Sequence, residues 1–174
     1  LVFVAIEQPP PLVEVLEGMD ERLGNIDFSA YAHHQRISYS IAANWKTYVD
    51  NFLEGYHLPH IHPGLNKLLD YRSYQTETAT WHSLQSSPLD RTTNFYGSGE
   101  ALYYFIFPNT MLNILPGRLQ TNRVVPISAD HCRVDFDFYY PPCEDSDELE
   151  RRARDLAFSD EVQVEDIAIC ERVQ

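Results

Sequence analysis

Cysteine is scarce in this sequence, and its spacing excludes several classes of protein. Among 174 residues only Cys132, Cys143 and Cys170 occur, and they form no CxxC pair. An odd number of widely spaced cysteines predicts neither a disulfide framework nor a zinc ribbon. Because structural disulfides mark oxidising compartments, this pattern favours a reducing one, and we predict a cytoplasmic protein.

The sequence also lacks long apolar runs and clusters of basic residues. No stretch is long enough to cross a bilayer as a helix, so membrane insertion is not predicted. The formal net charge is −13, which disfavours unspecific binding to nucleic acid and to anionic membrane surfaces. We therefore expect neither as a partner.

Several catalytic signatures are missing as well. The sequence contains no HExxH, GxSxG, Walker A or GxGxxG pattern, which argues against zincin proteases, α/β-type serine hydrolases and the common nucleotide-binding folds. A cysteine nucleophile is also disfavoured. Cys170 falls on the apolar side of a predicted helix, where thiols are usually inert.

What is present predicts one α+β domain, since 44% hydrophobic residues in a chain of this length suit a single core. Apolar and polar residues alternate at 37–41 and most cleanly at 134–140, as in half-buried strands. Strands first and a long helix last predict an antiparallel sheet with helices packed on one face. The other expected elements are strands at 75–84, 102–107, 111–115 and 119–125, a helix from Asn44 to Pro59, and a final helix after the acidic run 144–150.

The first candidate site contains His57 and His62, whose imidazoles are close enough in sequence to converge on one metal ion. On the predicted helix Asp50, Glu54 and His57 fall at i, i+4 and i+7 and share one face. Buried charges require pairing, hydrogen bonds or a metal. Two histidines at this spacing are a weak pattern, however. The alternative is that they and His60 are surface or hydrogen-bonded loop histidines.

The last predicted helix supplies a candidate third ligand. Asp166 lies in the middle of an apolar arc that includes Val162, whereas Glu165 lies outside it and is expected to face water. One interpretation is a core carboxylate satisfied by Arg or Tyr. The other is a site of two histidines and one carboxylate, which binds Fe(II) and leaves positions open for oxygen and substrate. Asp50 or His60 would then hydrogen-bond to the ligands.

Two motifs together resemble a known family. The first comprises Asn44-Trp45-Lys46, Asp50-Asn-Phe-Leu-Glu-Gly-Tyr-His57 and His62-Pro-Gly-Leu65, and the second is the closing segment Glu165 to Gln174. Both are similar to the catalytic domain of Rieske-type non-haem iron oxygenases. These are the large (α) subunits of aromatic-ring-hydroxylating oxygenases, including choline- and carnitine-type monooxygenases. The resemblance extends over about residues 30–174.

The resemblance implies a helix-grip, START-like fold and a mononuclear Fe(II) held by His57, His62 and Asp166. Glu54 occupies the place of the acidic residue that links this iron to a [2Fe-2S] Rieske cluster in a neighbouring subunit, and Asp50 is a further polar neighbour. The implied reaction is reductive activation of O2 and hydroxylation, or oxidative dealkylation, of a small aromatic or quaternary-ammonium substrate. In monooxygenation one oxygen atom enters the product and the other becomes water.

The same resemblance implies parts that this sequence does not contain. The CxH and CxxH pairs that hold the Rieske cluster in the family are missing. Residues 1–28, opening with a predicted strand at 1–6, are interpreted as the tail of a Rieske domain and a connector. Residues 29–174 are then a catalytic domain truncated at its C-terminus. The implied partners are a reductase or ferredoxin and the other copies of a homotrimer, and we expect this chain alone to be inactive.

Two other functions stay open at this point. A START-like module would bind a hydrophobic ligand in the same cavity without chemistry, and metal analysis would distinguish it from an oxygenase. A metal-dependent hydrolase would be active without O2. Tyr103, Tyr104, Phe105 and Phe107 are candidates for the wall of a pocket, although ordinary strand core is the simpler interpretation for at least half of them.

Overall fold

A computed structural model describes residues 4–5, 7–89 and 94–174. Within them the main feature is one antiparallel sheet with the strand order β1-β7-β6-β5-β4-β3-β2. The strands are β1 Ala32–Ile41, β2 Gln75–Thr78, β3 His82–Pro88, β4 Glu100–Ile106, β5 Thr110–Leu115, β6 Arg118–Pro126 and β7 Cys132–Tyr140. The α-helices are α1 Leu12–Val15, α2 Met19–Leu23, α3 Trp45–Leu53, α4 Leu58–Ile61, α5 Pro63–Leu68 and α6 Ser146–Val173, with short 3-10 turns at Phe28–Ala30 and Tyr71–Ser73.

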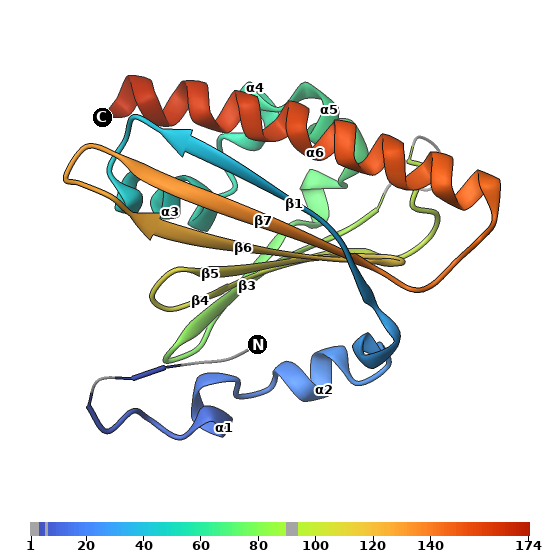
Figure 1. Cartoon of the computed structure of the whole chain (residues 1–174), viewed down its shortest axis with the longest axis horizontal. Coiled ribbons are helices and arrows are strands. Elements are labelled where there is room, and N and C mark those ends of the chain that lie inside the picture. Colours follow the sequence, from blue (N-terminus) through green and yellow to red (C-terminus); the bar gives the residue numbers. More distant parts are fainter. Residues whose placement is uncertain (1–3, 6, 90–93) are drawn as a thin grey trace.

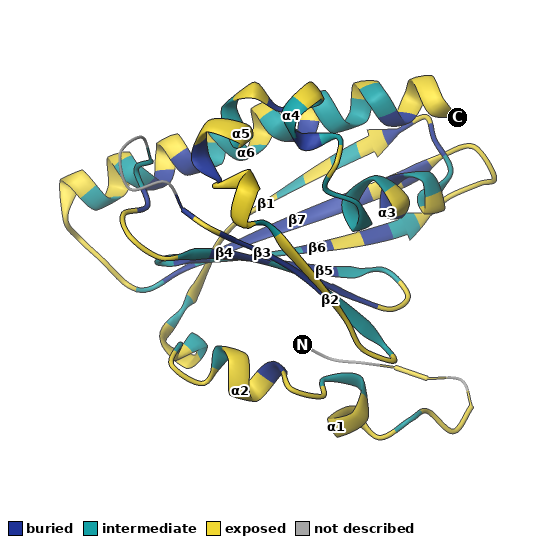
Figure 2. Ribbon diagram, turned by 180° about the vertical axis from the view of Figure 1, so that it is seen from behind, coloured by how far each residue is buried: buried dark blue, intermediate teal, exposed yellow. Residues whose placement is uncertain are grey.

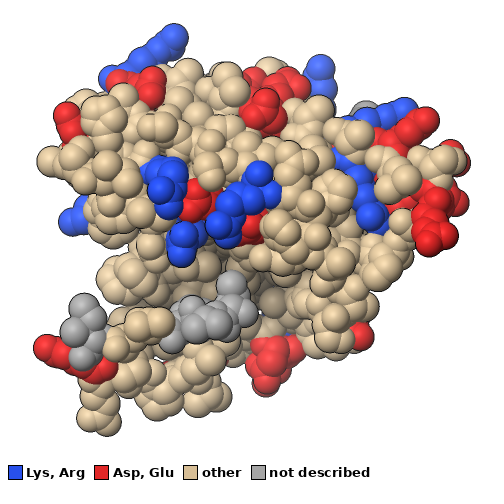
Figure 3. All heavy atoms as spheres, viewed as in Figure 1, with Lys and Arg blue, Asp and Glu red and all other residues tan. Residues whose placement is uncertain are grey.

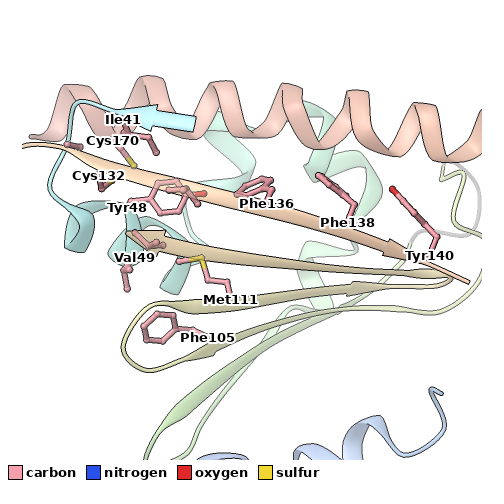
Figure 4. Close-up of a cluster of buried hydrophobic side chains, with 13 residues drawn as sticks. Ile41, Tyr48, Val49, Phe105, Met111, Cys132, Phe136, Phe138, Tyr140 and Cys170 are labelled. Carbon is pink, nitrogen blue, oxygen red and sulfur yellow. The ribbon is translucent and has the colours of Figure 1, made fainter. Parts of the chain in front are cut away.

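The long helix α6 crosses one face of the sheet, and α3, α4 and α5 lie on the same side (Figure 1). Buried side chains from α3, α6 and the strands meet between them, among them Tyr48, Phe136 and Cys170 (Figure 4). Burying one such aromatic or aliphatic side chain contributes about 1.5–3 kcal/mol, so this cluster holds the helices on the sheet. The predicted α+β, helix-grip architecture is confirmed.

The opposite face of the sheet has two different halves. Over β1, β7 and β6 basic and acidic side chains lie side by side (Figure 3). They form ion pairs, such as Arg36 with Asp137 at 2.7 Å. Over β3 to β5 it is apolar, and buried Tyr104 packs there in a cluster with Met19 of α2. Figure 2 shows α1 and α2 on this side of the sheet. The short helices α1 and α2 therefore cover part of a second face, in addition to the helices expected on the first.

The helix predicted from Asn44 to Pro59 begins where expected but ends early. The Asn44 side chain accepts a hydrogen bond from the backbone N–H of Lys46 at 2.9 Å, which caps α3. The helix then stops at Leu53, and Glu54 is already in an extended conformation. The predicted continuation of this helix through residues 54–57 is therefore wrong.

Gly55, a poor helix former, follows the last residue of α3 by two positions. A Cβ at this position would stand 2.6 Å from the ring of Tyr74, so the close approach of the two segments requires glycine. Pro59 does not terminate α3; it lies in the first turn of α4, where its missing N–H costs nothing. His57 consequently lies outside α3, and it shares no helix face with Asp50 and Glu54.

Two further predictions of secondary structure need comment. The extended segment predicted at 75–84 is wrong as a single strand, because the chain turns at 79–81 and β2 pairs antiparallel with β3. The strand predicted at 1–6 falls mostly outside the described residues; Val4 and Ala5 are exposed and in no strand. Among the described residues no helix combines the length and the apolar character that a membrane crossing requires.

Candidate metal centre

Three side chains from three separate segments converge beneath α6. His57 precedes α4, His62 joins α4 to α5, and Asp166 lies on α6. Nε2 of His62 lies 3.2 Å from Nε2 of His57 and 2.9 Å from Oδ1 of Asp166. Nε2 of His57 lies 3.7 Å from the same oxygen. Each residue thus offers one ligand atom, and all three atoms lie within 4.8 Å of one another.

A second carboxylate orients each imidazole. Oε1 of Glu54 lies 2.5 Å from Nδ1 of His57, and Oε2 of Glu165 lies 2.7 Å from Nδ1 of His62. Because an ionised carboxylate can only accept a hydrogen bond, each Nδ1 carries the hydrogen. In the neutral ring Nε2 then keeps its lone pair. Carboxylates paired with histidines in this way are typical of metal ligands.

The resulting set of lone pairs fits a divalent metal. Two imidazole nitrogens and one carboxylate oxygen point at the same small space, where three acceptors repel one another unless a cation joins them. Ligand atoms about 2.1 Å from an ion and at right angles to one another lie about 3.0 Å apart, close to the separations of 2.9 and 3.2 Å found here. Two histidines and one carboxylate are the ligand set of mononuclear Fe(II) oxygenases.

The electrostatics of the cluster are dominated by its carboxylates. Burial alone would lower the pKa of His62, but the hydrogen bonds and negative charges of Asp166 and Glu165 outweigh it, and the pKa lies above its ordinary value. Asn51 donates a hydrogen bond to Oδ1 of Asp166 at 2.7 Å, which holds that oxygen toward the histidines. A metal and a proton compete for the same Nε2, so acid weakens metal binding.

Not all of the predicted site residues lie in the cluster of metal ligands. His57, His62, Asp166 and Glu54 lie in one cluster, as described above. Asp50 is exposed on α3, and its side chain makes no hydrogen bond or ion pair with the residues that the structure describes. The predicted contact between Asp50 and the ligands is therefore absent, because Asp50 lies on the exposed side of α3, whereas its neighbour Asn51 faces the cluster.

Glu165 is the residue that the sequence prediction missed. We expected it to face water, but it bonds to His62 and only 27% of its side chain is exposed. The helical wheel of α6 considers one helix alone, and the segment between α4 and α5 covers the edge on which Glu165 lies. The adjacent pair Glu165-Asp166 was the available signal. His60, the other residue expected beside the ligands, is exposed.

A pocket extends from the cluster along the inner face of the sheet, with His57 and Asp166 at its lining and Arg118 and Tyr96 farther along. Of the four aromatic residues predicted as candidates, Tyr103 lines it. The others are strand core or surface: Tyr104 and Phe105 are buried in two hydrophobic clusters, and Phe107 is 58% exposed.

Comparison with known proteins decides the family. A sequence profile of the ring hydroxylating alpha subunit (catalytic domain) matches residues 28–174. The chain belongs to this family. Its members are Rieske oxygenases, which use a mononuclear non-haem iron and a Rieske [2Fe-2S] cluster in the other domain. The resemblance predicted from the two motifs is confirmed.

Among curated relatives, the chain is 37% identical over 156 residues to the chloroplastic choline monooxygenase of Arabidopsis thaliana. The aligned region covers 87% of this chain and 36% of that enzyme. The chain is 26% identical over 152 residues to the carnitine monooxygenase oxygenase subunit of Escherichia coli (strain K12), covering 80% of this chain and 38% of that subunit. The chain thus spans little more than a third of the length of these relatives.

Solved structures show the same fold. The quaternary ammonium Rieske monooxygenase in complex with L-carnitine superimposes with a TM-score of 0.78 at 24% identity, over 97% of this chain and 46% of that chain. Naphthalene 1,2-dioxygenase with bound indole gives a TM-score of 0.65 at 17% identity, over 95% of this chain and 48% of that chain. At these identities the likeness establishes the fold.

Proposed function

We propose that this chain is the catalytic domain of a Rieske non-haem iron oxygenase, in which His57, His62 and Asp166 hold Fe(II). The observation that carries the proposal is the convergence of three ligand atoms, with Glu54 and Glu165 orienting the two imidazoles. Iron held by these three residues would supply the redox chemistry by which O2 hydroxylates a C–H bond of a substrate.

We further propose that the substrate is a small quaternary-ammonium or aromatic molecule. The pocket beside the ligands is lined by the rings of Tyr48, Tyr74, Tyr96 and Tyr103, and aromatic faces attract organic cations as well as other rings. Burial raises the pKa of Tyr103 to about 12, so this ring is a neutral phenol at pH 7. The relatives named for choline and carnitine support the cationic choice.

The electrons for the reaction are proposed to reach the metal through Glu54. This side chain bonds to Nδ1 of His57 and is 22% exposed, so it connects a ligand with the molecular surface. In the intact enzyme a Rieske cluster on a neighbouring copy of a homotrimer would stand there, supplied by a reductase or ferredoxin in the cytoplasm. Residues 1–28 would then connect the two domains, and residues 29–174 would form the catalytic one.

Metal analysis tests the proposal directly. The chain is purified without oxygen, loaded with Fe(II) and desalted, and we expect about one iron per chain. His57→Ala, His62→Ala and Asp166→Ala each remove one ligand and should lose the iron. His60→Ala is the matched control: it removes an exposed histidine of the same segment and should retain iron. Circular dichroism confirms that each variant is folded.

Two results would contradict the proposal. Folded wild-type chain that takes up no iron would favour a START-like module that binds a ligand without chemistry. Iron retained equally by the three ligand variants would show that it binds elsewhere. A third readout is thermal: a metal that binds only the folded state stabilises it by about 2.7 kcal/mol at 100 times its Kd, and this gain should be missing in Asp166→Ala.

A further inference from the structure

The inner face of the sheet carries a row of polar side chains beneath the pocket. Gln85, Tyr103, Asn113 and Gln120 are register partners across β3, β4, β5 and β6, so their side chains point to the same side. All four line the pocket. Strands buried under a helix normally present apolar side chains to it, and amides at these positions therefore require partners.

Helix α6 faces this row with a polar edge of its own. Asp155, Ser159, Gln163 and Asp166 are spaced by four, four and three residues, so they lie along one side of the helix. Two of these side chains have protein partners on the sheet: Asp155 pairs with Arg118 at 2.7 Å, and the Ser159 hydroxyl bonds to Gln120 at 3.2 Å. Asp166 lies 2.9 Å from Nε2 of His62, which joins α4 to α5.

Three residues that line the pocket each carry one buried polar atom without a partner among the described residues. These atoms are Oδ1 of Asn113, Nε of Arg118 and Nε2 of Gln163. The three residues are 7%, 4% and 1% exposed. Gln163 lies on α6 and precedes Asp166 by three residues, or about 4.5 Å of helix rise. Its Oε1 is engaged by the hydroxyl of Tyr48 at 2.7 Å.

This set of atoms discriminates between ligands. A hydrocarbon filling the pocket would leave both donors and the acceptor unpaired, and each such group costs about 1–3 kcal/mol. A carboxylate can only accept and an ammonium can only donate, whereas a hydroxyl does both. A hydroxyl also matches either orientation of the two amides, whose nitrogen and oxygen are interchangeable by rotation.

We infer that the pocket selects a substrate bearing a hydroxyl group, which accepts a hydrogen bond from Gln163 and donates one to Asn113, over the same molecule bearing a methyl group. The inference rests on the proposed function, because it concerns the substrate of that site. Gln163 is then a specificity-determining residue, while the tyrosine rings accommodate the remainder of the molecule.

The test uses two matched pairs of probes: choline with propyltrimethylammonium, and benzyl alcohol with ethylbenzene. Calorimetric titration of the chain, with Fe(II) under anaerobic conditions and without metal, should show at least one hydroxyl compound binding about 10-fold more tightly than its partner. Gln163→Met, which keeps the volume, should reduce the ratio to about one. Asn113→Leu provides a second variant. Gln35→Met, an exposed position on β1, should leave the ratio unchanged.

The inference is overturned if neither hydroxyl compound is preferred by the wild type, including the case in which no probe binds. It is also overturned if both pocket variants, shown to be folded, keep the wild-type ratio. Failure of the proposed function is recognised separately, because it appears as missing iron in the same samples. A hydroxyl preference in metal-free chain supports the inference whatever the iron content.

Discussion

Helix α6 carries two carboxylates in the interior of the same domain, and they have opposite surroundings. Asp155 is fully buried and receives hydrogen bonds from Arg118 at 2.7 Å, from Tyr140 at 2.5 Å and from Tyr96. Asp166, with its side chain 17% exposed, bonds to Asn51 and His62 and has no Arg or Lys partner among the described residues.

The difference lies in the balance of charge around each group. At Asp155 one negative charge meets one permanent positive charge. The metal cluster contains three carboxylates, those of Asp166, Glu54 and Glu165, and two imidazoles. Both imidazoles are neutral when their Nε2 atoms are free to bind metal. A buried acid with its own cation is structural, whereas a cluster with surplus negative charge and converging lone pairs requires a cation from outside.

The largest expected effect distinguishes the two acids by stability. Asp155→Asn leaves Arg118 buried and uncompensated, and removing one partner of such a pair costs about 3–5 kcal/mol. Above the folded-state pKa of His62, where this imidazole is neutral, Asp166→Asn instead removes a repelling charge, so there the metal-free chain should be equally stable or more stable. Urea unfolding of both variants in the presence of a chelator measures the difference. Equal destabilisation by the two substitutions would remove the distinction between a structural and a metal-binding carboxylate.

A smaller effect is expected from the carboxylates that orient the histidines. Glu54→Gln and Glu165→Gln keep the side-chain size but weaken the hydrogen bond to Nδ1, and loss of such partners typically lowers metal affinity about 10–100-fold. Competition with a chelator measures the affinity. Glu161→Gln, an exposed position on the same helix, should have no effect. If the two variants bind metal as tightly as this control, the carboxylates do not tune the ligands.

Local sequence patterns were sufficient where the cause was local. The strict alternation at 134–140 predicted β7, and the apolar arc predicted α6. The predicted start of this helix, after the acidic run 144–150, is wrong, because α6 already begins at Ser146, capped by Asp145. Asn44 predicted the start of α3, since a cap acts within the first turn. The predicted end of α3 at Pro59 is wrong, because the nearer Gly55, a poor helix former, follows the last helical residue by two positions.

The metal ligands could be predicted from the sequence, but one of the carboxylates that orient them could not. His57, His62 and Asp166 were recognised from their residue types and from the resemblance to a family, and the structure brings them together. The interpretation of Asp166 as a core acid satisfied by Arg or Tyr describes Asp155 instead. Glu165 was missed because it meets His62 across 103 residues of sequence, and the wheel of one helix does not include its neighbours.

The smallest expected effect, a dependence on pH, sharpens the comparison further. In the metal-free chain the pKa of His62 is raised above 6.5. Its contribution to stability is therefore complete below pH 6.5 and is lost as the pH rises through the folded-state pKa. At Asp155 no partner titrates in this range, because burial raises the pKa of Tyr140 and the charge of Asp155 keeps that of Arg118 high despite its burial.

Metal should reverse the sign of this dependence, since it binds the deprotonated imidazole. Between pH 6 and 9 the free energy of unfolding should fall with pH in the presence of a chelator and rise with pH in anaerobic Fe(II). His62→Gln should abolish both slopes, whereas Asp155→Asn should lower the two curves and keep their slopes. Parallel slopes with and without metal would mean that His62 is not a ligand. If the free energy of unfolding of His62→Gln still changes with pH as in the wild type, the titrating group is not His62. The negative charge around Asp166 would then be balanced by neither a proton nor a metal at this histidine.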